Sequence, residues 1–394
     1  MKVCVFVQNL YTLGGVQRVV SYMLNELIKN QDATVTIMMP RNVSNENPSL
    51  YKISEKIEVI DLCNYLEFDA KSLARFLLAI NKRTAIFDNK WGQCLIEQLY
   101  VSRKSKQKIT EYLKSRGFDV IIGVGHFYSI LLAILKPELQ SKIIGWQHNT
   151  FESYFQTRSI NAYGLYRFAK RNYQKLDEVL VLTEADKIKF DCNFEIKSKV
   201  LYNPVYFPDS NREDYSNDRL LFLGRMTKKQ KGIDYLLRVL LNIKKEKPDF
   251  SCYIVGDGKD KNWIINKVSQ YDLRNNVEFF STTNNVYKYY NLSGIMLQTS
   301  RWEGFGLTIV EAMSTGISVV AFSNNGPDEI INNGVNGIIV PKFDIDLFSD
   351  SVLKLLNDKD LRRKIGEEAK IRASDFSISS IYPVFLEYLK KAIW

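Results

Sequence analysis

The stretch "KVCVFVQNLYTLGGVQRVVSYMLNELIKN", residues 2–30, decides the fold. It opens with an apolar run of strand length, continues with a polar loop that holds two glycines, and ends with apolar residues at helical spacing. A second stretch, "DRLLFLGRMTKKQKGIDYLLRVLLNIKKE" at 218–246, has the same order of strand, polar loop and helix. Each is typical of the opening of a doubly wound α/β domain, so the sequence predicts two such domains.

Further apolar runs of strand length alternate with helical segments in both halves. Such alternation predicts parallel sheets that bind ligands at the carboxyl ends of their strands. The runs are "VTIMM", "DVIIGVG", "KIIGWQH" and "EVLVLT", followed by "FSCYIVG", "NVEFFS", "GIMLQT", "SVVAF" and "NGIIV".

The segment 202–219 is rich in Pro, Asn, Asp and Ser and lacks helical periodicity, so it is the expected linker. We expect one domain over 1–203 and the other over 204–375. The remaining residues, 376–394, are expected to form a helix that Pro383 starts or kinks and that packs back on the first domain.

Composition narrows the class of protein. With 394 residues, 45% of them apolar, the chain can fill about two cores. Its longest apolar run, "SILLAIL", is far shorter than the ~18 residues of a membrane-spanning helix, and "MKVCVFVQNL" lacks the features of a secretion signal. The five scattered cysteines fit reduced thiols rather than a disulfide frame or a zinc site. A cytoplasmic protein is expected.

The net charge of +10 is uneven along the chain. Residues 1–200 hold 28 basic and 20 acidic side chains, against 26 and 24 in the rest. Part of the excess is the stretch "VSRKSKQKITEYLKSRG" at 101–117, which is either a solvated helix face or a surface that meets an anionic membrane. Nucleic acid is not an expected partner, because no aromatic stacking pattern or nucleic-acid motif accompanies it.

The stretch "SRWEGFGLTIVEAMSTG", residues 300–316, carries two glutamates between a strand and a helix. The helix is expected over 307–314 with Gly316 as its C-cap, which places Gly304 and Gly306 in a turn where free amides suit a phosphate. Beside a phosphate, Glu303 and Glu311 would accept hydrogen bonds from ligand hydroxyls. The alternative is two surface glutamates, with Glu311 on an exposed helix face.

The loop "LGRMTKKQKG" offers Arg225 and Lys231, cations that would neutralise a diphosphate leaving group. Taken singly, they fit solvent-exposed loop charges equally well. The segment "VGDGKD" at 255–260 has only part of a dinucleotide fingerprint, since its third glycine is absent, and so gives weak evidence for NAD.

Together these motifs resemble one family. The order of "LGGVQR", "NPV", "GRMTKKQKG", "VGDG", "SRWEGFGLTIVEAMSTG" and "NNGPDEIINNGVNGIIV" is similar to glycosyltransferase family 4, retaining enzymes of the GT-B type with two Rossmann-like domains facing a cleft. The resemblance runs from about residue 3 to residue 341. Glu303 and Glu311 match the E-x7-E motif of that family.

The resemblance implies roles for individual positions. Glu303 would hold hydroxyls of the transferred sugar, Glu311 the ribose hydroxyls of the nucleotide, and Arg225 with Lys231 the diphosphate. The implied donor-binding set is Gly14, Gly15, Arg225, Lys231, Glu303, Gly304, Phe305, Gly306, Leu307 and Glu311. The implied catalytic set is Glu303, His126, Arg225 and Lys231.

The chain has two histidines, and both follow a predicted strand. "DVIIGVGH" resembles the family strand whose last residue faces the transferred sugar, which favours His126, and "WQHN" places His148 at another recurrent family position. Both are therefore expected to bind acceptor or sugar. A structural hydrogen-bonding role is the alternative for each.

Two further segments have competing interpretations. In "NNGPDEII", Gly326 and Glu329 match the family's G-x-x-E and would hold donor groups, whereas Asn325 or Gly326 would otherwise cap a helix with Pro327 in its first turn. "DID" at 344–346 resembles a metal-binding D-x-D motif, but its position after the last predicted strand favours a helix cap. We expect no catalytic metal and no cofactor.

The function that the resemblance implies is retaining transfer of a hexose from a nucleotide diphosphate sugar, UDP being preferred, to a glycan or polyprenyl-diphosphate-linked acceptor. This would serve bacterial surface polysaccharide synthesis, lipopolysaccharide included, with the protein cytoplasmic and peripheral on the inner membrane face. A nucleotide-sugar epimerase or phosphorylase would share the architecture, although E-x7-E argues against both. A catalytically silent nucleotide-sugar-binding protein is the remaining alternative.

Overall fold

The computed structural model describes residues 1–40, 51–66, 80–81, 84, 86–87, 89–156, 162–207 and 217–393. The chain divides into two compact units. Unit 1 comprises Met1–Tyr202 and Ile381–Trp394, and unit 2 comprises Asn203–Ser380. The expected linker lies partly outside the described residues.

Unit 1 is built on a seven-stranded sheet with the order β3-β2-β1-β4-β5-β6-β7, and all its pairings are parallel. The five strands predicted in this half are present. Two short edge strands, β3 and β7, escaped prediction because neither shows a run of buried apolar residues. The strands are β1 Lys2–Phe6, β2 Thr34–Met39, β3 Glu58–Asp61, β4 Val120–Val124, β5 Lys142–Trp146, β6 Glu178–Val181 and β7 Lys199–Val200.

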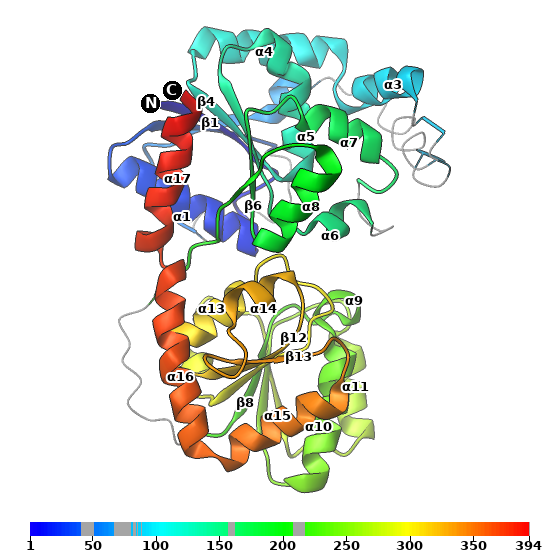
Figure 1. Ribbon diagram of the computed structural model, residues 1–394, viewed down its shortest axis with the longest axis vertical. Coiled ribbons are helices and arrows are strands. Elements are labelled where there is room, and N and C mark those ends of the chain that lie inside the picture. Colours follow the sequence, from blue (N-terminus) through cyan, green and yellow to red (C-terminus); the bar gives the residue numbers. More distant parts are fainter. Residues whose placement is uncertain are drawn as a thin grey trace. The chain divides into compact units, whose positions relative to one another are not determined.

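Helices cover both faces of this sheet (Figure 1). The basic stretch predicted to be helical forms α4, which buries a stripe around Ile109 and Leu113, is capped by the Ser102 hydroxyl, and ends at Gly117. The helices are α1 Gly15–Lys29, α3 Lys90–Tyr100, α4 Arg103–Arg116, α5 Gly125–Leu135, α6 Phe151–Phe155, α7 Tyr166–Tyr173 and α8 Glu184–Phe194, with 3-10 turns η1 Leu62–Tyr65 and η2 Lys136–Glu138.

Unit 2 is built on a six-stranded parallel sheet with the order β10-β9-β8-β11-β12-β13. All six were predicted from their apolar runs, which are fully buried in the four inner strands, as parallel sheets covered by helices require, and partly exposed in the edge strands β10 and β13. They are β8 Leu220–Leu223, β9 Cys252–Val255, β10 Val277–Phe280, β11 Ile295–Gln298, β12 Ser318–Phe322 and β13 Ile338–Val340. The two sheets confirm the α/β class with two doubly wound domains.

In unit 2, α10 and α11 lie on one face of the sheet and α13 and α16 on the other (Figure 1). The expected helix cap at 344–346 is confirmed, since the Asp344 carboxylate accepts a hydrogen bond from the Leu347 amide. The helices are α9 Lys228–Lys231, α10 Ile233–Glu246, α11 Lys261–Gln270, α12 Tyr287–Asn291, α13 Leu307–Ser314, α14 Asn325–Ile330, α15 Ile345–Asn357 and α16 Lys359–Ala373, then η3 Ser374–Phe376.

The last helix, α17 Ile378–Ile393, carries the chain back from unit 2 into unit 1. There Phe385 stacks on Trp146 at 5.3 Å between ring centroids. Pro383 does not start the helix, because α17 begins five residues earlier, where Ser377 and Ser380 hydrogen-bond each other. No helix within the described ranges is long and apolar enough to cross a bilayer.

Candidate functional site

The order of the strands in unit 2 reverses between β8 and β11, because the chain proceeds outward to β9 and β10 and then returns to continue outward on the other side. Ligands of doubly wound sheets bind at such a switch point, outside the carboxyl ends of the strands. Lys231 follows β8 and Glu303 follows β11. The topology therefore brings these two predicted residues into contact, although 72 positions separate them in the chain.

Lys231 ends a short helix, so the expectation of an irregular polar loop there is wrong. The Thr227 hydroxyl caps α9 by accepting a hydrogen bond from the Lys231 amide at 3.4 Å. Gly232 follows at φ 62°, where an added Cβ would lie 2.0 Å from the Thr299 carbonyl oxygen. Only glycine permits this approach, which holds Lys231 against the end of β11.

Glu303 is buried, so the alternative of a surface glutamate is wrong. Its Oε1 accepts hydrogen bonds from Lys231 Nζ at 2.6 Å, Gln298 Nε2 at 2.7 Å and Ser300 Oγ at 2.6 Å. The Glu303 amide donates to Asn324 Oδ1 at 2.7 Å. No donor from the part of the chain that the structure describes contacts Oε2. One carboxylate oxygen thus anchors the side chain, and the other keeps its capacity to accept from a ligand.

A second ion pair ties the turn after β11 to α9 and α10. Arg301 donates to both carboxylate oxygens of Asp234 at 2.7 Å, and its guanidinium lies 4.1 Å from the centre of the Tyr235 ring. The Arg301 amide also donates to the Gln230 carbonyl at 2.7 Å. Burial alone would raise the pKa of Asp234, but the hydrogen bonds and charge of Arg301 outweigh it and lower that pKa. These contacts of Arg301 fix the end of α9, which carries Lys231, relative to the turn that carries Glu303.

The turn after Glu303 leads into α13, which spans 307–314 as predicted and is followed by Gly316 at φ 75°. Gly306 caps the helix at φ 113° without a side-chain hydrogen bond. The first amides of a helix have no intrahelical acceptor, and they form the positive end of its dipole. The Phe305 ring is buried against Phe376, so only backbone of the predicted segment from Gly304 to Leu307 is suited to hold an anion.

Glu311 lies inside unit 2 rather than on its surface. Its side chain is 1% exposed, and Oε2 accepts a hydrogen bond from the Tyr290 hydroxyl at 2.8 Å. The alternative that placed Glu311 on an exposed helix face is therefore wrong. Tyr290, on α12, was missed by sequence reasoning, since nothing local links it to a glutamate 21 positions away.

The two glycine-containing loops that follow β8 and β9 pack against each other. A Cβ on Gly256 would lie 2.1 Å from the Gly224 carbonyl oxygen, and one on Gly258 would lie 2.4 Å from that of Met226. The glycines of "VGDG" thus allow close packing against the loop after β8. This packing explains their presence without a bound NAD. Arg225, in the same loop, is exposed, and no carboxylate within the described ranges pairs with it.

The segment "NNGPDEII" forms α14, with Asn324 rather than Asn325 or Gly326 at its cap position and Pro327 in its first turn. Gly326 packs on the β11 turn so tightly that an added Cβ would lie 1.9 Å from the Phe305 carbonyl oxygen. The Glu329 carbonyl accepts a hydrogen bond from Arg372 at 2.9 Å. Gly326 thus shapes the turn that carries Glu303.

Unit 1 reverses its strand order between β1 and β4. Gly14 and Gly15 follow β1 and begin α1, and the Gly14 amide donates to the Tyr51 hydroxyl at 3.1 Å. His126 follows β4 in the first turn of α5. The predicted residues of this half therefore also flank a switch point.

His126 lies in an aromatic environment formed by α6 and α7. Its ring is stacked on Tyr173 at 5.9 Å and meets the edge of Phe155 at 5.2 Å. Nδ1 lies 3.2 Å from the Tyr173 hydroxyl, whereas Nε2 is buried without a partner in the described part of the chain. Burial lowers the pKa of His126 to about 3, so the ring is neutral near pH 7. His148, after β5, is also buried and packs on Trp146 at 4.6 Å.

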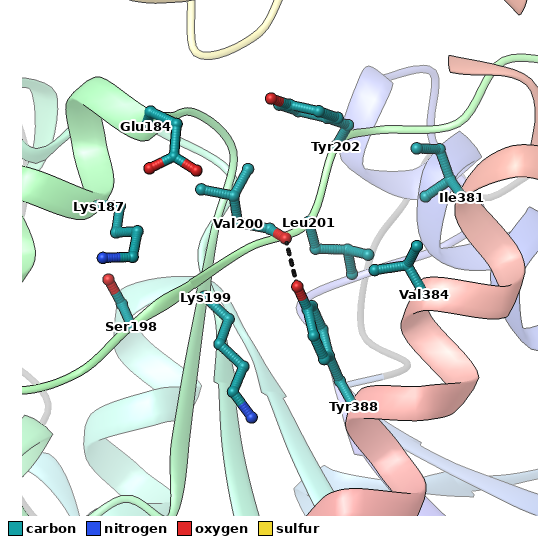
Figure 2. A pocket seen from close by; sticks show the side chains of 10 residues that line it. All are labelled: Glu184, Lys187, Ser198, Lys199, Val200, Leu201, Tyr202, Ile381, Val384 and Tyr388. Atoms are coloured by element: carbon teal, nitrogen blue, oxygen red, sulfur yellow. Dashed lines mark hydrogen bonds between the residues drawn. The ribbon is translucent and has the colours of Figure 1, made fainter. Parts of the chain in front are cut away.

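A separate cavity of about 360 Å³ lies in unit 1 beside α17, and Figure 2 shows the side chains around it. Its cations are already engaged: Lys187 pairs with Asp191 at 2.9 Å and Lys199 with Glu178 at 2.7 Å. The Tyr388 hydroxyl donates to the Val200 carbonyl at 3.1 Å. The lining residues are Glu184, Lys187, Ser198, Lys199, Val200, Leu201, Tyr202, Ile381, Val384 and Tyr388, so the predicted site residues lie elsewhere.

Among the described residues, no group of three or more His, Cys, Asp or Glu side chains is placed to hold a metal ion.

Known proteins are similar to this chain in sequence and in fold. Residues 207–372, nearly all of unit 2, match the family described as "Glycosyl transferases group 1". A relative from Haemophilus influenzae, named an uncharacterized glycosyltransferase, is 25% identical over 383 residues, which cover 96% of this chain and 97% of the relative. A second is an α-1,4-N-acetyl-D-galactosaminyltransferase of Campylobacter jejuni, named for an acceptor linked to PP-undecaprenol. It is 23% identical over 394 residues, 99% of this chain and 98% of the relative.

Among solved structures, Anabaena HepE in complex with UDP has a TM-score of 0.75 at 17% sequence identity, and the match covers 99% of this chain and 100% of that one. The apo form of WaaB, named a lipopolysaccharide outer core galactosyltransferase, has a TM-score of 0.73 at 16% identity, and the match covers 99% of this chain and 100% of that one. At these identities the likeness shows only that this chain shares the fold of both proteins.

Proposed function

We propose that this chain is a glycosyl transferase of group 1, the family that its residues 207–372 match, and that it moves a hexose from a UDP-sugar to a hydroxyl of a glycan or lipid-linked acceptor with retention of configuration. The observation that carries the proposal is the Lys231–Glu303 pair at the switch point of unit 2, with Nζ and Oε1 2.6 Å apart. A cation beside a carboxylate that keeps one free oxygen suits a ligand with phosphate at one end and hydroxyls at the other. A nucleotide sugar has that pattern.

The reaction breaks the bond between sugar C1 and the diphosphate oxygen, which leaves with the electron pair, and forms a bond between C1 and the acceptor oxygen. The proposed role of Lys231, Arg225 and the amides at the start of α13 is to stabilise the charge that develops on the leaving diphosphate. The acceptor proton passes to an oxygen of that diphosphate on the same face of the sugar. Since these groups supply the positive charge, the proposal requires no metal.

Glu303 would hold the sugar rather than attack it. Three donors already bind Oε1, which fixes the carboxylate and leaves Oε2 to accept from a sugar hydroxyl. A charge-assisted hydrogen bond of this kind contributes about 1.5–3 kcal/mol. Glu311 is proposed to act near the ribose, and its bond to the Tyr290 hydroxyl would position it.

The proposed acceptor is a surface polysaccharide precursor. The Campylobacter relative is named for an acceptor on PP-undecaprenol, and another relative, 28% identical, is named for amylovoran biosynthesis in Erwinia amylovora. The proposed role of His126 and His148 in unit 1 is to bind the acceptor and the transferred sugar. Gly14 and Gly15 are proposed to let the backbone approach the donor phosphate or the acceptor.

A thermal-shift and hydrolysis screen across UDP- and GDP-sugars tests this function. A donor at 100 times its dissociation constant is expected to stabilise the protein by about 2.7 kcal/mol, and slow release of the nucleoside diphosphate should accompany binding. Binding without turnover, in the presence of glycan acceptors as well, would instead identify a silent nucleotide-sugar-binding protein. Formation of an epimerised nucleotide sugar would identify an epimerase.

The basic face of α4 is the proposed contact with an anionic membrane. Arg103, Lys104, Lys108 and Lys114 are exposed on the side opposite the buried Ile109, and Trp91, at the start of the preceding helix, is 89% exposed. Exposed tryptophan and exposed basic residues are both typical of interfacial membrane contact. Reversing Lys104 and Lys108 to glutamate should weaken binding to phosphatidylglycerol vesicles at low salt at least tenfold, since each charge contributes about 1 kcal/mol.

The matched control reverses two lysines of α10 in unit 2, Lys244 and Lys245, and should leave vesicle binding unchanged. Binding of the unaltered protein should weaken as salt rises and be absent on neutral vesicles. Equal loss in both double variants would refute a specific role of α4. The membrane proposal fails altogether if the protein does not bind anionic vesicles and uses a soluble acceptor equally well.

A further inference from the structure

A chain of buried polar side chains links His126 to backbone carbonyls of unit 1. Ser129 Oγ lies 3.1 Å from the Gly123 carbonyl oxygen and 2.9 Å from that of Gly125. Gln147 Nε2 lies 2.8 Å from Ser129 Oγ, and Gln147 Oε1 lies 2.9 Å from the Tyr173 hydroxyl. Ser129, Gln147 and Tyr173 are each 0% exposed. In such a dry chain every hydrogen needs an acceptor.

The direction of each hydrogen bond follows from the carbonyls. A carbonyl can only accept, so the single Ser129 hydroxyl hydrogen must be donated to Gly123 or Gly125. Ser129 Oγ is therefore an acceptor for Gln147, which requires the amide nitrogen of Gln147 on that side and its oxygen on the side of Tyr173. The Tyr173 hydroxyl must then donate to Gln147 Oε1.

The same reasoning fixes the proton on His126. Tyr173 has spent its only hydrogen on Gln147, and burial raises the pKa of Tyr173 well above its usual value, so the hydroxyl stays protonated. Its oxygen can only accept from His126 Nδ1, 3.2 Å away. Nδ1 therefore carries the hydrogen. A neutral imidazole has one, so Nε2 carries none.

We propose that Ser129, Gln147 and Tyr173 are positioning residues that hold His126 as the Nδ1–H tautomer, so that Nε2 is a hydrogen-bond acceptor reserved for a hydroxyl donor. That the hydroxyl belongs to the transferred sugar rests on the proposed function. A bare Nε2 repels phosphate oxygens, which have lone pairs but no hydrogen to give, and so selects the sugar part of a nucleotide sugar. Nε2 is buried without a partner in the described part of the chain, as a group awaiting a ligand would be.

Nitrogen-15 NMR of the full-length protein tests the assignment, because the chain contains only two histidines. A His148→Gln variant identifies the signals of His126. The unprotonated ring nitrogen is expected to be Nε2, and the proton-bearing one Nδ1. A protonated Nε2, or an imidazolium near pH 7, overturns the proposal.

Two variants test the positioning role. In Gln147→Met, the Tyr173 hydroxyl loses its acceptor and turns to donate to Nδ1, so the His126 proton is expected to move to Nε2. In Tyr173→Phe, Nδ1 loses its acceptor, and both tautomers should be populated. Tyr154→Phe is the control, because that ring lies 5.6 Å from His126 without a hydrogen bond to either of its ring nitrogens, and should leave the tautomer unchanged.

Turnover adds a second readout. Gln147→Met is expected to lower kcat about tenfold, the effect of one lost hydrogen bond, with a smaller change in KM. An unchanged His126 tautomer in both Gln147→Met and Tyr173→Phe refutes the positioning role. If Gln147→Met fails to fold, the spectra of Tyr173→Phe and of the unaltered protein still test the proposal. If no nucleotide sugar is turned over, the proposed function fails, while the NMR result stands by itself.

Discussion

Replacing Lys231 with alanine is expected to lower kcat/KM for sugar transfer by about 10²–10³-fold, the range found when one preorganised group that stabilises transition-state charge is removed. Lys231 Nζ is held 2.6 Å from Glu303 Oε1, at the switch point where the diphosphate is proposed to lie. A mobile surface lysine would lose side-chain entropy when it met the diphosphate, whereas the side chain of Lys231 is already held in place by Glu303. Release of the nucleoside diphosphate measures the rate.

Stability must be separated from catalysis in this experiment. Lys231→Ala leaves the buried Glu303 carboxylate without its cation, which costs about 3 kcal/mol of stability by analogy with other buried pairs. The double variant Lys231→Met, Glu303→Gln removes both charges and should regain most of the loss in urea unfolding without regaining activity. Recovery of activity together with stability would contradict the proposed role.

Glu303→Gln alone keeps an oxygen for the three donors around Oε1 but places an amide where Oε2 is proposed to face the ligand. A loss of about 10–150-fold is expected, which corresponds to one charge-assisted hydrogen bond. Lys244→Ala is the matched control, since this lysine of unit 2 pairs with the exposed Asp272 at 2.8 Å, away from the switch point. Its turnover should equal that of the unaltered protein.

Gly326→Ala is expected to destabilise unit 2 by about 2–3 kcal/mol, although alanine is normally the better helix former. Gly326 lies in α14, and its added Cβ would lie 1.9 Å from the Phe305 carbonyl oxygen and 2.5 Å from the Phe305 carbonyl carbon. Those backbone atoms belong to the turn that carries Glu303, so the turn must shift. The stability measured by urea unfolding and the affinity for the donor should both fall.

Gly334→Ala separates backbone strain from overlap. This residue has φ 77°, and an added Cβ would meet no atom within 4 Å. The loss should be that of a left-handed backbone alone, roughly 1–2 kcal/mol, with donor binding unchanged. If Gly326→Ala is as stable and as active as the unaltered protein, the turn does not depend on this close contact.

The fold could be predicted where a signal lay within a few consecutive residues. The buried strands appear as apolar runs, and α1, α10 and α13 have helical periodicity, so the sequence indicated all of them and the two doubly wound domains. The edge strands β3 and β7 lack that signal, because an edge strand with half-exposed residues does not need a continuous apolar run. Pro383 lies inside α17, which was one of its two expected positions; the sequence left both open, and the helix that contains it packs on unit 1.

The candidate site also has features that the sequence indicated and features that only the structure revealed. Glu303, Glu311 and the turn between them were evident from a local strand–turn–helix pattern. That Glu303 is anchored by Lys231 and Asn324, that Glu311 meets Tyr290, and that Tyr173 and Gln147 bind in series to His126 all depend on residues 21 to 72 positions apart.

The sequence by itself thus determined which residue types stand at the carboxyl ends of the strands and that these strands belong to two parallel sheets. Only the tertiary structure decided which of those ends are neighbours, because the order β9-β8-β11-β12 is set by packing between elements distant in the chain. That order places Lys231 against Glu303 and turns two separate charges into one buried pair. The physical reason is that local periodicity reports burial, whereas hydrogen bonds and ion pairs require the register of the whole sheet.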